Sequence, residues 1–186
     1  MKIKFFALGL FVGFAVIAIA GYTFIVTGGM PVPTKSKPLP FEEEIAEMSI
    51  GIATKEAASL TAPLEATERH LLEGVKIYLT NCAACHGLPM KDPNAIAKGM
   101  YPPPPQLFSP DQAAVGYPVG GLYWVVKNGI RLTGMPGFGD TLTEEQIWQV
   151  THLVHSADKL PPSVLEALNE STAVAQPPVL PPDAID

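Results

Sequence analysis

The two cysteines of this 186-residue chain lie three positions apart, and a histidine directly follows the second. The stretch NCAACHGL at 81–88 would therefore gather Cys82, Cys85 and His86 on one helical turn. Few other parts of the chain concentrate reactive side chains. Fold and function consequently depend on what this pentad, CAACH, can hold.

The start of the chain indicates where the pentad operates. Lys2 and Lys4 precede an uncharged run, FFALGLFVGFAVIAIAGYTFIV, at 5–26. As a helix this run would span roughly 33 Å, enough to cross a hydrocarbon core of about 30 Å. A cleaved signal peptide is the alternative, because AIA at 18–20 looks like a cleavage site, but the apolar run continues beyond it. We predict a retained transmembrane anchor; with either interpretation the lysines stay cytoplasmic and the rest is exported.

Four chemistries fit a C-x-x-C-H sequence. A catalytic disulfide would need a thioredoxin-like framework of alternating strands, and strand patterns are scarce here. A zinc site would need a fourth ligand beside the pentad, and the only other histidines are His70, His152 and His155. Two free buried thiols are unusual in an exported protein. The fourth chemistry is covalent attachment of c-type haem, for which this pentad is the recognised signature.

The spacing within the pentad also suits haem. Each thiol adds to one vinyl group to form a thioether, and cysteines three apart on a helical turn can reach both vinyls of one ring edge. The adjacent histidine is then directed at the iron from the proximal side. Because an apolar helix leads into the pentad and the chain is exported, we predict haem attachment at Cys82 and Cys85, with His86 as an axial ligand.

A six-coordinate iron needs a second axial ligand, and we predict Met135. It lies in NGIRLTGMPGFGD at 128–140, where glycines and Pro136 let the backbone pass close over a flat ring. Filling core space is the alternative role for a methionine. Met90 is too close to His86, and Met100, before a proline run, is the second choice. The other exported candidates are Met30 and Met48 in the linker and His70, His152 and His155, which we expect to be solvated, although the last two could also form a metal pair.

Patterns along the chain divide it into four parts. After the anchor at 1–26, a linker rich in proline and acidic residues covers 27–65, a globular domain covers 66–160, and a largely disordered tail covers 161–186. The linker contains a short helix within 41–60, with an apolar side formed by Ile45, Met48 and Ile52.

Three further helices are expected within the domain. One begins near Thr67 and leads into the pentad, where Gly74 indicates close approach by another helix. A second, within 120–129, is closed by Asn128 and Gly129. In the last, Thr143 and Gln146 form a capping box, and Pro161 and Pro162 end it. Beyond it, SVLEALNE forms one or two turns.

Charge excludes one class of function. The exported part carries 10 basic and 18 acidic residues, because only Lys2 and Lys4 fall within the anchor region, so its formal charge is −8. No basic stripe for nucleic acid exists. The acidic surface either only confers solubility or docks a cationic partner.

These features together resemble the class I cytochrome c family, in particular membrane-bound bacterial monohaem modules. The matching stretches are GVKIYLTNCAACHG at 74–87, GMPGFG at 134–139 and LTEEQIWQVTHLV at 142–154. The resemblance implies an all-α domain around one haem, with Gly74 and Tyr78 at a crossing of the first and last helices. The usual aromatic of the last helix is replaced by Leu153, for which Trp148 could compensate.

The resemblance also implies a function. We expect a one-electron carrier in a respiratory or related chain and not an enzyme, anchored in a bacterial inner membrane with its haem domain in the periplasm. Its partners would be redox proteins such as a membrane dehydrogenase, a quinol-oxidising complex or a terminal oxidase. The chain would be either a tethered carrier or a fixed complex subunit. If Met135 does not bind, the iron would be open, and a gas sensor or weak peroxidase is the alternative.

Overall fold

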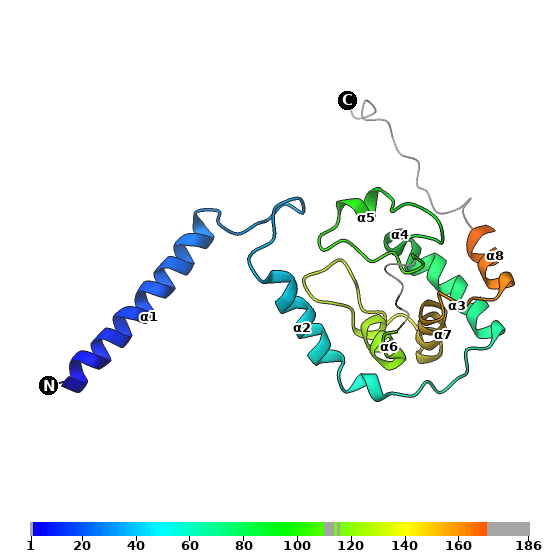
Figure 1. The fold of residues 1–186 in the computed structure, drawn as a ribbon, viewed down its shortest axis with the longest axis horizontal. Helices are drawn as coiled ribbons and strands as arrows, with labels where there is room; N and C mark the ends of the chain where they lie inside the picture. The colour runs from blue at the N-terminus through cyan, green and yellow to red at the C-terminus, as the bar shows by residue number, and fades with distance from the viewer. Residues whose placement is uncertain (1, 110–113, 115, 171–186) are drawn as a thin grey trace, which may run out of the picture. The chain divides into compact units, whose positions relative to one another are not determined.

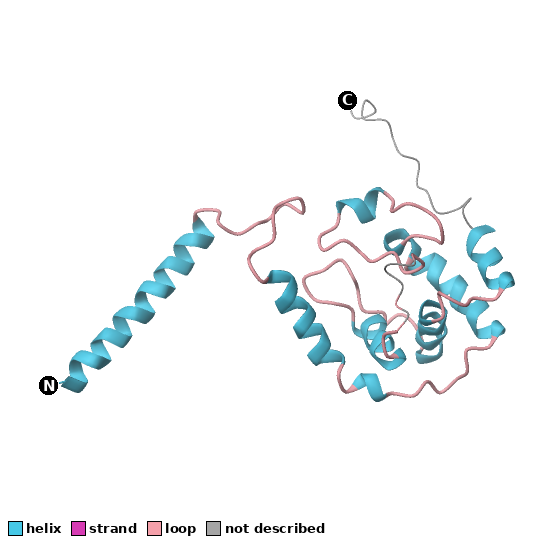
Figure 2. Ribbon diagram, in the orientation of Figure 1, coloured by secondary structure: helices cyan, strands magenta, loops and turns pink. Residues whose placement is uncertain are grey.

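The computed structural model describes residues 2–109, 114 and 116–170, and these residues form helices and loops without a strand (Figure 2). The predicted all-α class is confirmed. The chain divides into two compact units, one ending at Ile45 and one beginning at Ala46, and each is described by itself. The part of the predicted tail beyond residue 170 lies outside the described residues.

The first unit contains one long helix, α1 (Lys2–Val26; Figure 1). Its apolar side chains are exposed all around the helix, which has no buried face. The 24 residues Ile3–Val26 would span about 36 Å at 1.5 Å per residue. The helix is closed by Thr27, whose N–H donates to the carbonyl of Thr23. By length and composition, α1 can cross a membrane.

Helix α2 (Glu42–Thr54) is shorter than the expected range of 41–60. The Glu42 carboxylate accepts a hydrogen bond from the backbone N–H of Leu39, which helps to fix the start of the helix. The predicted apolar side exists, but it is not buried. Ile45, Met48 and Ile52 are 60%, 64% and 67% exposed.

The end of the predicted linker belongs to the second compact unit. Residues 57–64, which we call the strap, begin with a short 3-10 helix, η1 (Ala57–Ser59), that packs against α6 (Val119–Asn128). Ala57 is buried there, and a Cβ at Gly120 would lie 2.9 Å from the Cβ of Leu60. The boundary predicted at residue 65 is therefore too late, because the strap buries apolar surface on α6.

Helices α3 (Glu68–Asn81) and α7 (Glu144–His155) form the centre of the domain (Figure 1). The close approach predicted at Gly74 is present, since a Cβ at this position would lie 2.5 Å from the Gln149 carbonyl oxygen. It would also lie 3.2 Å from the Cβ of Leu153. Both helices begin as predicted, with Thr67 capping α3 and the Thr143–Gln146 capping box starting α7.

Leu153 is fully buried against α3, so an aliphatic side chain fills the crossing. Trp148 does not compensate there. Its ring instead stacks on Tyr123 of α6, with ring centroids 4.1 Å apart and an interplanar angle of 14°. Trp148 thus fastens α6 to α7, whereas Leu153 and Gly74 fasten α7 to α3.

The folded domain continues beyond the boundary expected at residue 160. Helix α8 (Pro162–Glu170) packs against α3 through the fully buried side chains of Val164 and Leu168. The prolines begin this helix instead of ending the previous one, because proline is well suited to a first helical position. Helix α7 ends earlier, where the Ser156 N–H donates to the His152 carbonyl.

Candidate haem-attachment site

The pentad lies on a single turn at the end of α3. Cys82 is the C-cap residue of α3 and the N-cap residue of the short helix α4 (Ala83–His86). Backbone N–H groups of Cys85 and His86 both donate to the Cys82 carbonyl, at 3.1 and 2.9 Å. We call residues 82–87 the pentad turn. Both thiols are free and partly buried, so the turn presents two unpaired sulfur atoms and one imidazole together.

The imidazole of His86 has a fixed orientation. Its Nδ1 lies 2.8 Å from the carbonyl oxygen of Pro105, and because a carbonyl only accepts, Nδ1 carries the proton. The bond to Pro105 therefore leaves the lone pair of Nε2 available for a metal. Burial lowers the pKa of His86, while the bond to Pro105 acts in the opposite direction. The side chain is thus a neutral, oriented nitrogen donor at neutral pH.

The thiol of Cys82 holds its proton at neutral pH. Burial, followed by the nearby Cys85, raises the pKa of Cys82 to about 12. Zinc binds the thiolate, so it would have to displace the proton of this thiol. Among the described residues, no three His, Cys, Asp or Glu side chains are grouped as a metal ion would require.

Tyr78 fixes the pentad turn, and Phe108 packs against Tyr78. The hydroxyl of Tyr78 donates to the carbonyl of Gly87 at 2.7 Å, and its ring packs edge-on against Phe108 at a centroid distance of 5.0 Å. Burial, with a smaller effect of Cys82, raises the pKa of Tyr78, so the hydroxyl stays a donor. Gly87 itself adopts a φ of 70°, which favours glycine. The pentad turn is therefore anchored to the core of the domain.

The proline-rich segment is tied to the same turn. The side-chain amide of Gln106 donates to the carbonyl of Cys85 at 3.3 Å and to that of Pro104 at 3.2 Å. Prolines lack an N–H but keep their carbonyls, so the run supplies acceptors without competing donors. The contributions of Pro105, Gln106 and Phe108 were not predicted from the sequence. The proline run indicates an extended path, but not which carbonyl would meet His86.

Met135 lies in a loop at 129–139, which we call the methionine loop. The Ile130 N–H donates to the Met135 carbonyl at 3.1 Å, and the Met135 N–H donates to the hydroxyl of Thr133 at 3.1 Å. That hydroxyl donates in turn to the Ile130 carbonyl at 2.7 Å. These bonds give the loop a closed backbone around the methionine.

Glycines allow the ends of the methionine loop to meet. A Cβ at Gly129 would lie 2.5 Å from the Gly137 nitrogen, and a Cβ at Gly137 would lie 2.7 Å from the carbonyl carbon of Asn128. The predicted reason for Gly137 was passage over a flat ring, whereas Gly129 was predicted to close the helix. The contacts show a more local reason, namely backbone packing between the end of α6 and the returning loop.

The other methionine candidates differ in how far their side chains are buried. Met90 is fully exposed, and Met30 and Met48 are also exposed. Met100 is partly buried and lies against Gly134, next to Met135. It follows α5 (Ala95–Gly99), which packs against α4, so the described contacts connect the pentad turn to the methionine loop through α5 and Met100.

The prediction of a solvated His152 is wrong. Its side chain is only 8% exposed, and Nε2 lies 3.0 Å from the carbonyl of Leu64 in the strap. His70 also supports this region, since its Nδ1 lies 2.7 Å from the Glu65 carbonyl and its Nε2 lies 3.1 Å from an Arg69 guanidinium nitrogen. These two histidines hold the end of the linker and do not face the pentad turn through any described contact.

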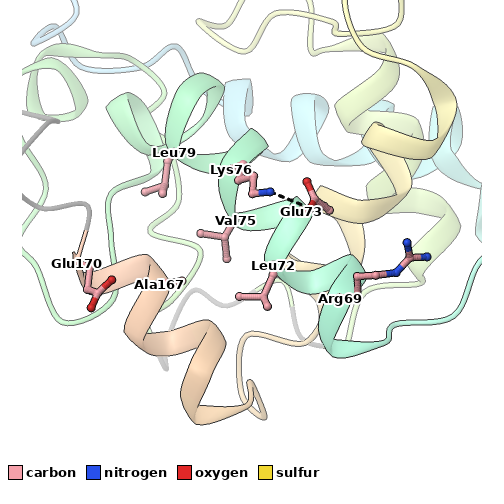
Figure 3. A pocket seen from close by; sticks show the side chains of 8 residues that line it. All are labelled: Arg69, Leu72, Glu73, Val75, Lys76, Leu79, Ala167 and Glu170. Atoms are coloured by element: carbon pink, nitrogen blue, oxygen red, sulfur yellow. Dashed lines mark hydrogen bonds and ion pairs between the residues drawn. The ribbon is translucent and has the colours of Figure 1, made fainter.

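A shallow groove of about 440 Å³ lies between α3 and α8 (Figure 3). Glu73 and Lys76 form an ion pair at 2.8 Å on its α3 side, and both are substantially exposed. Neither the pentad residues nor Met135 line it. The groove is lined by Arg69, Leu72, Glu73, Val75, Lys76, Leu79, Ala167 and Glu170.

Comparison with known proteins agrees with this geometry. Residues 69–154 match the family model described as cytochrome C oxidase, cbb3-type, subunit III. The chain contains a class I c-type cytochrome domain. This domain type carries covalently bound haem c and transfers electrons through it, and the free thiols and the uncommitted His86 Nε2 fit such a group.

A chain of the reducing HAO-like protein complex of Kuenenia stuttgartiensis is a similar solved structure, with 28% sequence identity and a TM-score of 0.44. The match covers 54% of this cytochrome chain and 48% of that chain, so it spans about half the length of its structural relative. No curated protein sequence matches the chain.

Proposed function

We propose that the cytochrome domain carries one haem c, bonded through thioethers to Cys82 and Cys85 and ligated by His86 and Met135. The supporting observation is the bond between His86 Nδ1 and the Pro105 carbonyl. A second partner of this kind fixes the tautomer of a ligating histidine and directs its other nitrogen at the metal. When bound, the haem supplies an iron that exchanges one electron.

The proposed ligands define what this electron exchange can do. A thioether from Met135 is a soft ligand, which raises the reduction potential relative to a second histidine. With both axial positions filled, no position remains for a substrate. We therefore propose an electron carrier and not an enzyme, in which the domain orients the ligands and excludes water from them.

We further propose that α1 anchors the chain in a bacterial inner membrane, with the cytochrome domain on the periplasmic side. The lysines at the start of α1 favour export of everything after it. Residues 31–40 alone could reach about 31 Å as an extended proline-rich spacer. A tether of this kind raises the effective concentration of the domain near membrane-bound redox partners in a respiratory or related chain.

A fixed subunit of a larger membrane complex is the second candidate. The exposed apolar side of α2, formed by Ile45, Met48 and Ile52, favours this arrangement. Detergent-solubilised native membranes would discriminate the two candidates by size-exclusion chromatography. Elution of the haem protein at the size of the single chain would support the carrier, and elution with other subunits would support the complex.

The ligand assignment is tested by the visible spectrum of the purified protein, oxidised, then reduced with dithionite, then exposed to carbon monoxide. We expect the weak far-red band of methionine-ligated ferric haem, sharp reduced bands and no reaction with carbon monoxide. Loss of the far-red band together with ready carbon monoxide binding would contradict the assignment of Met135 and favour gas sensing or peroxidase chemistry.

A further inference from the structure

We infer that Met100 is a positioning residue for the axial ligand, since its side chain packs on Gly134 and keeps the methionine loop in the place where Met135 can bind iron. This inference rests on the proposed ligation by Met135. It assigns a role to Met100, which has none in the proposed ligation by His86 and Met135.

Met100 is itself held in a defined position. It caps the C-terminus of α5, where its N–H donates to the carbonyl of Ala97 at 3.3 Å. The N-terminus of α5 is capped by Asn94, whose Oδ1 accepts from the Ala97 N–H at 2.9 Å. The Nδ2 of Asn94 donates to the Ala84 carbonyl at 2.6 Å. Helix α5 therefore ties Met100 directly to the backbone of the pentad turn.

The methionine loop needs such a support from outside. Its internal hydrogen bonds define its shape, but the side of the loop next to Thr133 faces solvent, with Leu132 93% exposed and in a left-handed conformation with a φ of 63°. Where the loop returns to α6, the Phe138 N–H donates to the Val126 carbonyl at 3.0 Å and the Gly139 N–H donates to the Lys127 carbonyl at 2.9 Å. These bonds fix the base of the loop, whereas the Met100 contact at Gly134 fixes the part next to Met135.

The contact at Gly134 is close and specific. A Cβ built at Gly134 would fall against the terminal methyl group of Met100 and within 3.6 Å of its sulfur. Among the described residues, no atom other than these two, beyond the adjoining residues of the chain, comes within 4 Å of that position. Gly134 is also not among the glycines with positive φ, so the space taken by Met100 is what favours glycine here.

A support of this kind predicts a measurable consequence. When the methionine loop leaves its place, Met135 leaves with it, and the reduced protein becomes able to bind carbon monoxide. The rate of carbon monoxide binding therefore reports the fraction of molecules with the loop displaced. Removing the Met100 side chain would increase that fraction without touching either proposed ligand.

The experiment compares four variants of the full-length haem protein in detergent: Met100→Ala, Met100→Leu, Met90→Ala and Met135→Ala. We expect Met100→Ala to keep the far-red band but to bind carbon monoxide about tenfold faster, a factor that corresponds to about 1.4 kcal/mol. Met100→Leu should restore the rate to within about twofold, because volume and not sulfur is required. Met90→Ala removes the fully exposed methionine and should change nothing.

A double-mutant cycle isolates the contact itself. Gly134→Ala should accelerate carbon monoxide binding when Met100 is present, and it should do so much less in the Met100→Ala background, where the methyl group no longer occupies the space. Additive effects of the two substitutions would contradict the inference. So would an unchanged binding rate in Met100→Ala.

Met135→Ala separates this inference from the proposed function. Loss of its far-red band confirms Met135 as the ligand, and an unchanged Met100→Ala then overturns only the positioning role. If Met135→Ala keeps the band while Met100→Ala loses it, Met100 is the ligand, and both the proposed ligation and the positioning role are wrong.

Discussion

The pentad turn and the methionine loop differ in how the chain holds them. The pentad turn is continuous with α3 and is fixed by the buried Tyr78 and by the Pro105 carbonyl. The methionine loop is held by bonds within itself, by backbone bonds from Phe138 and Gly139 to α6, by glycine contacts at its ends and by Met100. One side of the site is thus part of the core, whereas the other is a loop placed against it. We expect that a substitution on one side abolishes its own bond to the haem and leaves the bond on the other side intact.

The largest effect is expected from removing the thiols. The double variant Cys82→Ser, Cys85→Ser should retain no haem after denaturation, because neither thioether can form. A denaturing gel stained for haem peroxidase activity measures this directly, with Met90→Ala as a control that keeps the stain. Haem retained in the double variant would mean that other residues make the covalent attachment.

The next effect should be confined to the methionine loop. Met135→Ala should keep its covalent haem on the same gel, lose the far-red band and bind carbon monoxide when reduced. Its reduction potential should also fall, because the thioether ligand favours ferrous iron. If this variant loses covalent haem as well, the two sides of the site are not independent.

Gly129→Ala should destabilise the domain by about 2–3 kcal/mol, through a strained φ of 69° and crowding of the Gly137 backbone. Denaturant unfolding of the haem protein measures this change. Gly99→Ala is the matched control, because a Cβ there would meet nothing within 4 Å. A free energy of unfolding equal in the two variants would contradict the role of glycine packing at the base of the loop.

Two hydroxyl deletions compare the two sides of the site. Tyr78→Phe removes one side-chain hydrogen bond and Thr133→Val removes two, each worth about 1 kcal/mol. We expect Tyr78→Phe to lower the free energy of unfolding without changing carbon monoxide binding. Thr133→Val should accelerate carbon monoxide binding. The same pattern in both variants would remove the distinction between core and loop.

The smallest expected effect is a pH dependence of stability caused by His152, which lies in neither the pentad turn nor the methionine loop. Burial lowers the pKa of His152 in the folded domain, the bond to Leu64 acts in the opposite direction, and the neighbouring His155 and His70 lower the pKa further. Below about pH 6.5 the unfolded chain binds a proton that the folded chain resists, so stability should decrease as pH falls below that value. His152→Gln should flatten this dependence in thermal unfolding between pH 5 and 7, whereas His155→Gln should leave most of it.

The sequence predicted the pentad turn well because its chemistry is contiguous. Cys82, Cys85 and His86 need only a helical turn to come together, and α3 was indicated by the apolar residues that lead from Thr67 into the pentad. Gly74 could likewise be identified, because a glycine in a helix is costly unless another helix comes close.

The remaining features depend on contacts between distant segments. Nothing in a proline run shows that the carbonyl of Pro105 meets His86, and nothing near Met100 shows that it reaches Gly134. His152 was expected in solvent because a solvated histidine on such a helix is commoner than a metal ligand. Only the path of the strap over α7 makes it a buried donor to Leu64.

The strap has a consequence for how often the domain would meet its partners. Because residues 57–64 are fastened to α6 and α7, the proposed tether can use only the residues before them. A shorter tether confines the domain to a smaller volume beside the membrane, so it meets partners in that volume more often and cannot reach partners farther away. Contacts that hold the strap, such as Ala57 on α6 and Leu64 on His152, would thus set the distance over which the cytochrome domain can meet partners.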